Sequence, residues 1–248
     1  IFFKVLETIW LTRPKAFLLE NVAGLCSADQ GRCMESIVDS LVLLGTHTIY
    51  WQVLNTKEHG IPHNRDRVFF AGILRGHGNG SFAFPSPSPI MDIRQFLDRR
   101  HGRPSFADLP PAAQATARRN VLQALQNIEA AGRDPFHDPW IIDCDSSDLY
   151  TKAFPGVSPC ITRNRTNGHW LTSMGRRMSL QEALRLQGFD DCFENMVSER
   201  QLRMMLGNSM SLNVLERIFC RLLPAAGLSG PLLDPLIGDS VSPWRRRA

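Results

Sequence analysis

The chain has 248 residues, of which 43% are hydrophobic, and a formal net charge of +4. This length allows one large domain or two modest ones with an ordinary globular core, and the mild positive charge permits a polyanionic partner without requiring one. Six cysteines without a C-x-x-C spacing argue against a disulfide scaffold or a zinc module and indicate a reduced, intracellular chain. No apolar run is long enough to span a membrane, no signal peptide opens the chain, and no metal site is predicted. Because the first residue is Ile1, we expect the sequence to begin inside a longer reading frame or to be processed.

Helix and strand patterns alternate over the first 75 residues. Apolar residues at helical spacing predict helices over residues 1–12 and around 37–44, which Pro14 and Gly45 end. Strands are predicted over residues 16–20, 48–54 and 67–73. The pattern is typical of half a doubly wound α/β sheet, whose other strands residues 1–75 cannot supply. No Gly-rich dinucleotide or phosphate loop precedes the first strand.

The composition changes near Leu74, where glycines and a Pro-Ser repeat over 85–89 indicate a linker or boundary loop. Beyond it we expect a short helix over 90–100, a longer helix with an apolar face over 121–128, and an irregular stretch with turns and short strands over 133–175. A capping box at Ser179–Glu182 predicts a further helix, and an apolar helix is expected over 212–223. We therefore divide the chain into 1–75, a smaller domain over 76–190, a segment over 191–225 that returns to the first part, and a tail over 226–248.

Glu20 ends the first predicted strand. A carboxylate at the carboxyl end of a central strand is where open α/β sheets place chemistry. The alternative is a solvated strand-end acid, since catalytic carboxylates are a minority. The stretch Leu18–Asn21 alone leaves the two interpretations about equal.

Arginines gather in three places. Arg65 and Arg67 follow a rigid turn containing Gly60 and Pro62, and they face one side if the strand has already begun there. Two guanidiniums suit an acceptor-rich ligand, although ordinary ion pairing with neighbours such as Asp66 is the alternative. Two further arginines, each beside a threonine, are candidates for phosphate contacts: Arg163 and Arg165. A third group is interpreted as a solvated face: Arg94, Arg99, Arg100 and Arg103.

Four stretches occur in the order found in one enzyme family. Leu19-Glu20-Asn21-Val22 resembles its Glu-Asn-Val motif, and the segment from Leu54 to Arg67 resembles its Gln-x-Arg-x-Arg motif and the residues before it. Residues 177–189 and Leu206-Gly207-Asn208-Ser209 are similar to its ninth and tenth motifs. Together they resemble the C5-cytosine DNA methyltransferases over residues 1–223, with a variable segment between the second and third stretches.

The resemblance implies the second half of a Rossmann-like S-adenosylmethionine-dependent methyltransferase sheet with a smaller, irregular recognition domain. It implies transfer of a methyl group to C5 of a cytosine flipped out of double-stranded DNA. Glu20 would be the acid that protonates or hydrogen-bonds the ring nitrogen N3, Arg67 would contact the cytosine O2, and Arg65 would hold the site. Asn208 and Ser209 would lie on the S-adenosylmethionine side.

The departures from the family pattern are also informative. His63 stands where the family has Gln, which leaves one polar contact under the active-site turn in question. The Gly-containing cofactor loop and the Pro-Cys-Gln nucleophile should precede Glu20, but only nineteen residues do, and none is Cys. Pro159-Cys160 lies on the wrong side of Glu20 and is interpreted as incidental.

We therefore expect a fragment that is inactive alone, with the nucleophile supplied by an upstream segment or a second chain. The alternatives are a tRNA-directed enzyme of the same family and a catalytically dead nucleic-acid-binding chain. The expected location is intracellular: the nucleus if the source is eukaryotic, the cytoplasm if it is bacterial.

Overall fold

The computed structural model describes residues 1–79, 81–99, 102–147 and 151–236. The described chain forms two compact units. The first contains Ile1–Asn55, Asp66–Ser88 and the chain from Val214 on, and the second contains Thr56–Arg65 and Pro89–Asn213. The linker expected after residue 75 thus groups with the first unit, as do the helical residues from Val214. Arg100 and residues 237–248 of the expected tail lie outside the described residues.

The first unit is built on a three-stranded sheet. Its elements are α1 (Phe2–Thr12), β1 (Ala16–Val22), α2 (Arg32–Leu43), β2 (His47–Asn55), β3 (Asp66–Leu74) and most of α6 (Leu212–Ala225), with two short 3-10 helices, η1 (Ala23–Cys26) and η2 (Ala28–Gly31), between β1 and α2. The strand order is β1-β3-β2, and β3 is antiparallel to both neighbours. In the register, Glu20 lies opposite Phe69 and Val22 lies opposite Arg67.

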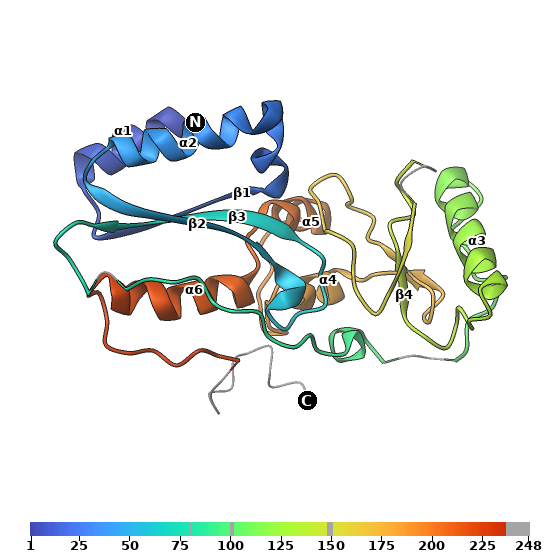
Figure 1. Cartoon of the computed structure of the whole chain (residues 1–248). Helices are drawn as coiled ribbons and strands as arrows, with labels where there is room; N and C mark the ends of the chain where they lie inside the picture. The colour runs from blue at the N-terminus through green and yellow to red at the C-terminus, as the bar shows by residue number, and fades with distance from the viewer. Residues whose placement is uncertain (80, 100–101, 148–150, 237–248) are drawn as a thin grey trace. The chain divides into compact units, whose positions relative to one another are not determined.

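Helices cover both faces of this sheet. Figure 1 shows α1 and α2 over one face and α6 over the other. The cluster between the first two helices and the sheet includes Ile9, Leu41 and Phe70, all nearly inaccessible to solvent. A Cβ at Gly72 of β3 would lie 2.1 Å from the Phe17 ring, so β1 and β3 pack closely only because position 72 has no side chain.

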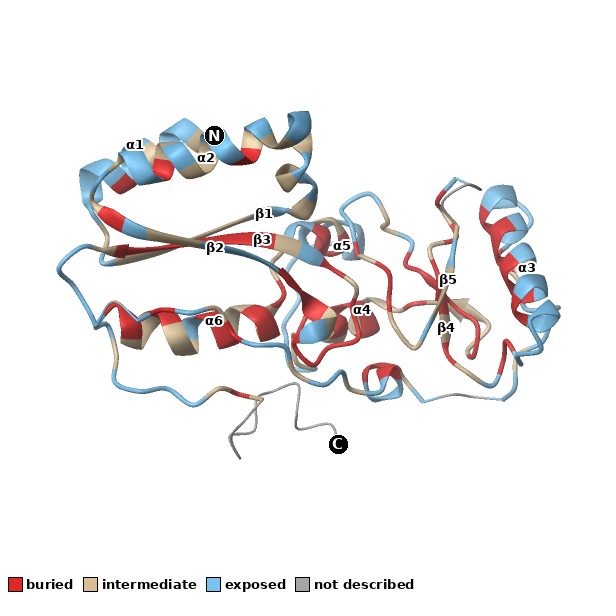
Figure 2. Ribbon diagram, in the orientation of Figure 1, coloured by how far each residue is buried: buried red, intermediate tan, exposed pale blue. Residues whose placement is uncertain are grey.

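The second unit contains a smaller sheet. Its elements are η3 (Thr56–Glu58), η4 (Ile93–Phe96), α3 (Ala115–Ala130), β4 (Trp140–Ile142), β5 (Ala153–Pro155), β6 (Trp170–Leu171), β7 (Arg176–Arg177), α4 (Leu180–Leu186) and α5 (Glu199–Asn208). The strand order is β5-β4-β6-β7, with every pair antiparallel. The buried stripe of α3 packs on this sheet through residues such as Val121 and Leu125, and its other side is exposed (Figure 2).

The predicted capping box of α4 is confirmed. The Ser179 hydroxyl accepts a hydrogen bond from the Glu182 N–H, and the Glu182 carboxylate accepts one from the Ser179 N–H. Glu182 is fully buried, and the Arg176 guanidinium lies 2.8 Å from its carboxylate. The helix start is therefore fixed by its own sequence and by a charged partner on β7.

Candidate active site

Glu20 and Arg67 form an ion pair across two adjacent strands. Glu20 lies near the carboxyl end of β1 and Arg67 near the amino end of β3, and the register makes them diagonal neighbours on one face. The Arg67 Nε lies 2.7 Å from the Glu20 Oε1, and the two side chains are only 13% and 14% exposed. Arg67 also donates to the Asp66 carbonyl, at 2.7 Å. The carboxylate and the guanidinium predicted to act on one substrate therefore lie together.

Arg65 does not share a face with Arg67. Strand β3 begins at Asp66, so the alternation that would align the two side chains has not started at residue 65. Arg65 is 2% exposed, and its guanidinium donates to the Ile161 carbonyl at 3.0 Å and the Ser209 carbonyl at 2.5 Å. The condition for placing both guanidiniums on one face is therefore not met: Arg65 binds backbone carbonyls in the second unit, whereas Arg67 pairs with Glu20 in the first.

The residues assigned to the cofactor lie at the end of α5. Asn208 is exposed. The Ser209 hydroxyl donates to the Leu206 carbonyl at 2.8 Å and accepts from the Gln187 amide at 3.1 Å. Asn208 is thus accessible, whereas the Ser209 hydroxyl is engaged in holding the turn.

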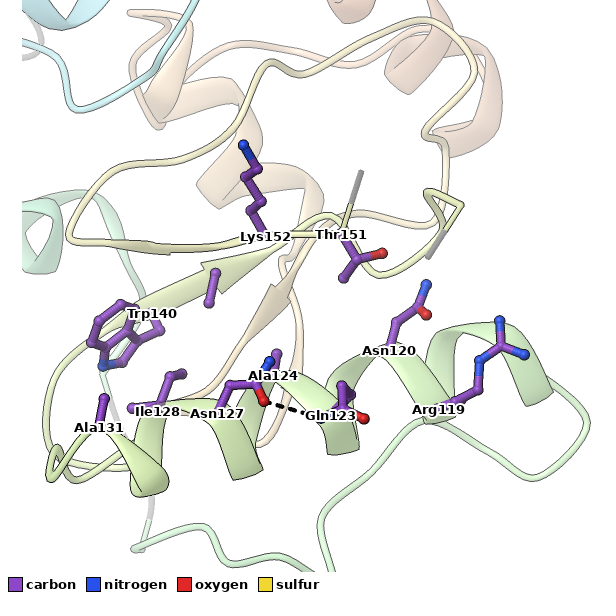
Figure 3. A pocket seen from close by; sticks show the side chains of 11 residues that line it. Arg119, Asn120, Gln123, Ala124, Asn127, Ile128, Ala131, Trp140, Thr151 and Lys152 are labelled. Carbon is purple, nitrogen blue, oxygen red and sulfur yellow. Dashed lines mark hydrogen bonds between the residues drawn. The ribbon is translucent and has the colours of Figure 1, made fainter. Parts of the chain in front are cut away.

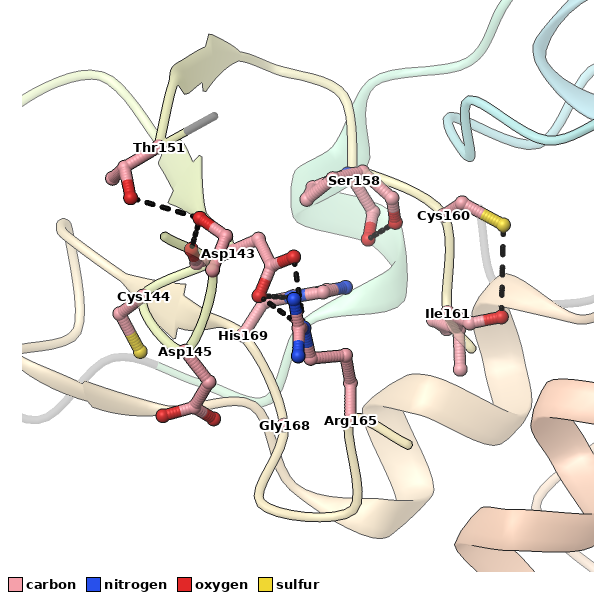
Figure 4. A network of polar contacts seen from close by, with 12 residues as sticks. Asp143, Cys144, Asp145, Thr151, Ser158, Cys160, Ile161, Arg165, Gly168 and His169 are labelled. Atoms are coloured by element: carbon pink, nitrogen blue, oxygen red, sulfur yellow. Dashed lines mark hydrogen bonds and ion pairs between the residues drawn. The ribbon is translucent and has the colours of Figure 1, made fainter. Parts of the chain in front are cut away.

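The two arginines predicted to contact phosphate differ in their surroundings. Arg163 is exposed, whereas the Arg165 Nε lies 2.9 Å from the Asp143 carboxylate (Figure 4). The neighbouring His169 Nδ1 lies 3.8 Å from the same carboxylate, and burial lowers the pKa of this imidazole despite the opposing effect of Asp143. Arg163 is therefore the more accessible of the two, and Arg165 is held by a carboxylate.

A cavity in the second unit has none of the predicted site residues among the described residues that line it. It has a volume of about 600 Å³ and lies between α3 and the strands β4 and β5, with Trp140 and Asn127 on its walls (Figure 3). The Lys152 side chain points away from α3 in this view.

Among the described residues, no group of His, Cys, Asp and Glu is arranged to hold a metal ion. No helix in the described part of the chain is long and apolar enough to cross a membrane.

Comparison with known proteins places the site in a family. The family described as C-5 cytosine-specific DNA methylase matches residues 1–223, a stretch that contains every predicted site residue. The chain belongs to this family. The predicted fold is confirmed as the mixed α/β fold of methyltransferases. The motif that contains Glu20 and the motif that contains Arg67 meet in the ion pair described above.

Individual relatives show the extent of the similarity. The type II methyltransferase M.NgoBI of Neisseria gonorrhoeae is 33% identical over 228 residues, which are 90% of this chain and 66% of the relative. M.HaeII of Haemophilus aegyptius is 29% identical over 219 residues, 88% of this chain and 64% of the relative. The solved Dnmt2 methyltransferase of S. pombe has a TM-score of 0.53 at 17% identity and matches 90% of this chain and 72% of that chain. This chain spans slightly less than two thirds of the length of M.NgoBI and of M.HaeII.

Sequence reasoning missed the buried polar contacts around the turn before β3. The Gln187 amide donates to the Leu206 carbonyl, and its carbonyl accepts from the Ser211 hydroxyl, both at 2.8 Å. The Asn213 amide donates to the His59 carbonyl at 2.7 Å. Polar residues in an otherwise apolar stretch were the available signal, but their partners are far away in the sequence.

Proposed function

We propose that this chain carries the acid and arginine part of a DNA cytosine-5 methyltransferase site, which transfers a methyl group from S-adenosylmethionine to C5 of a flipped-out cytosine. The observation that carries the proposal is the Glu20–Arg67 pair, 2.7 Å apart and mostly buried, in a chain of the C-5 cytosine-specific family. An exposed pair would be an ordinary surface contact of little consequence. We also propose that the protein acts inside the cell, because its proposed substrate is DNA.

The two side chains suit the two polar positions of a cytosine ring. When the Glu20 carboxyl carries a proton, it protonates or hydrogen-bonds N3, which makes C6 electrophilic enough for a thiolate to add. The Arg67 guanidinium donates to O2. Inside a duplex N3 is base-paired and both faces of the ring are stacked, so the target cytosine must leave the base stack. A phosphate contact from the exposed Arg163 helps to hold the strand.

The nucleophile and most of the cofactor site are proposed to come from an upstream segment or a second chain. Three observations support this. The sequence contains no Pro-Cys-Gln, and it spans 66% and 64% of two methyltransferase relatives. Strand β1 also lies at an edge of its sheet, where a further strand can pair. When bound, S-adenosylmethionine supplies the methyl group, and Asn208 is the side chain that this chain offers to it.

Substitutions of the ion pair test the roles in the enzyme completed with its nucleophile. We expect Glu20→Gln to slow single-turnover methylation by about 10²–10⁴-fold, because the amide cannot give the proton that N3 needs. DNA affinity at fixed salt should stay near that of the parent, since phosphate contacts set most of it. Arg67→Ala should also weaken capture of the flipped base, which a fluorescent base analogue at the target position reports.

Matched controls use exposed ion pairs elsewhere in the chain. Glu7 pairs with Lys4 on α1, and Arg94 pairs with Asp92. We expect Glu7→Gln and Arg94→Ala to methylate at the parent rate. If Glu20→Gln did the same, Glu20 would be only a strand-end carboxylate and the proposed role would be wrong.

A further inference from the structure

His63 lies at the centre of the turn that leads into β3. It is fully buried, and its Nε2 accepts a hydrogen bond from the Ile161 N–H at 3.0 Å. A backbone N–H only donates, so the imidazole must be neutral with its proton on Nδ1. The contact thus specifies both the charge and the tautomer of His63.

The same contact fixes the segment that Arg65 binds. Ile161 is held at both polar atoms, with its N–H on His63 and its carbonyl on Arg65. Two further hydrogen bonds, each 2.8 Å long, join the turn to this segment: Asn64 N–H to the Ser158 carbonyl and Ser158 N–H to the Pro62 carbonyl. The turn and residues 158–161 are therefore joined by two backbone hydrogen bonds and by the hydrogen bond that the His63 side chain accepts.

Arg65 lies on the same turn as His63 and binds the same residue, Ile161. Arg165, Arg203 and His169 line a cavity of about 10 Å³ beside Ile161, and the two arginines are paired with the Asp143 and Glu199 carboxylates. His59 lies on the turn, and Cys160 directly precedes Ile161. Protonating His63 would remove the Nε2 acceptor and place a cation next to Arg65, so two effects act in the same direction.

We propose that His63 is a positioning residue for the methyl-transfer site: as a neutral imidazole it locks the turn that holds Arg65 and precedes Arg67. This rests on the proposed function, but the lock itself is a property of the chain alone. It follows that protonation of His63 breaks its hydrogen bond with the Ile161 N–H and opens the lock. A Gln at position 63 offers an acceptor that does not titrate, so it should keep the lock closed at every pH.

Amide exchange and nitrogen shifts of the labelled 248-residue chain test the lock. At neutral pH the His63 ring should show the Nδ1–H tautomer and the Ile161 amide should be protected. As acid protonates His63, protection of Ile161, corrected for intrinsic exchange, should fall by about tenfold, the effect of losing one hydrogen bond. His63→Gln should keep its protection in acid, His63→Leu should lack it at both pH values, and the exposed control His77→Gln should behave as the parent.

Two results would overturn the proposal: protection of Ile161 that survives protonation of His63, or protection that His63→Gln loses at the same pH as the parent. A second readout is the pH profile of single-turnover methylation by the completed enzyme, in which His63→Gln should be less sensitive to acid than the parent. If neither the parent nor any variant of the completed enzyme methylates DNA, the proposed function fails. The exchange data still decide the role of His63 in that case.

Discussion

At the scale of single residues, Gly207 shows how closely the segments of the second unit approach. A Cβ at this position would lie 2.1 Å from the Arg163 backbone nitrogen and 2.3 Å from the Thr162 carbonyl carbon. Both are backbone atoms, which cannot rotate away as a side chain would. The Gly207 carbonyl also accepts from Arg65, at 3.3 Å. The glycine therefore permits the close contact between α5 and the chain around Arg163.

We expect Gly207→Ala to destabilise the chain by roughly 1–3 kcal/mol, because an added methyl group in a packed contact forces the backbone apart. Urea unfolding followed by tryptophan fluorescence measures this. The control is Gly230→Ala, where a Cβ would meet nothing within 4 Å. Equal unfolding midpoints for the two variants would contradict this prediction, because they would show that α5 can move away from the backbone at Arg163 without loss of stability.

At the scale of elements, a buried ion pair holds the segment after α6. The Arg217 guanidinium on α6 and the Asp234 carboxylate beyond it are 2.9 Å apart, with side chains only 2% and 10% exposed. Burial raises the pKa of Asp234, but the hydrogen bonds from Arg217 and from the Leu236 N–H outweigh it, so the pKa lies below its ordinary value. A lowered carboxyl pKa means that the pair stabilises the fold above the unfolded-state pKa, near 4, and that this stabilisation is lost as the pH falls.

We expect Asp234→Asn to cost of the order of 3 kcal/mol at pH 7, since it leaves a buried guanidinium without its counter-charge. At pH 3 the difference from the parent should shrink, because acid protonates Asp234 in the unfolded parent and so reduces the advantage of the folded, ionised carboxylate. Urea unfolding at both pH values measures the two differences. Glu7→Gln, which removes an exposed pair, should change stability little at either pH. A cost for Asp234→Asn that is the same at both pH values would contradict the assignment of the pair.

At the scale of the whole molecule, the proposed reaction needs groups from outside this sequence. Glu20 and Arg67 are the residues proposed to provide the acid and the O2 contact, but no residue of this sequence matches the nucleophile, and β1 lies at the edge of its described sheet. A further strand beside β1 would extend the sheet and cover that edge.

We expect the 248-residue chain alone to transfer no methyl group from labelled S-adenosylmethionine to DNA. Activity should appear when the segment of a relative that precedes the matched region is supplied, either fused to Ile1 or as a separate chain. A version of that segment with its nucleophilic Cys changed to Ser is the control and should restore nothing. Methyl transfer by residues 1–248 alone would overturn the assignment of roles.

The sequence by itself determined the elements of the first unit and the motifs that name the family. Helix and strand periods, the proline after α1 and the Ser179–Glu182 capping box are local signals, since each depends on residues within a few positions of one another. Short strands were expected within 133–175, but the positions of β4 to β7 were not, because two or three residues are too few to show an alternating pattern. Only the tertiary structure paired Glu20 with Arg67 and separated Arg65 from it, and it alone showed that His63 accepts from Ile161. These contacts join residues far apart in the chain, where strand register and burial decide which side chains meet.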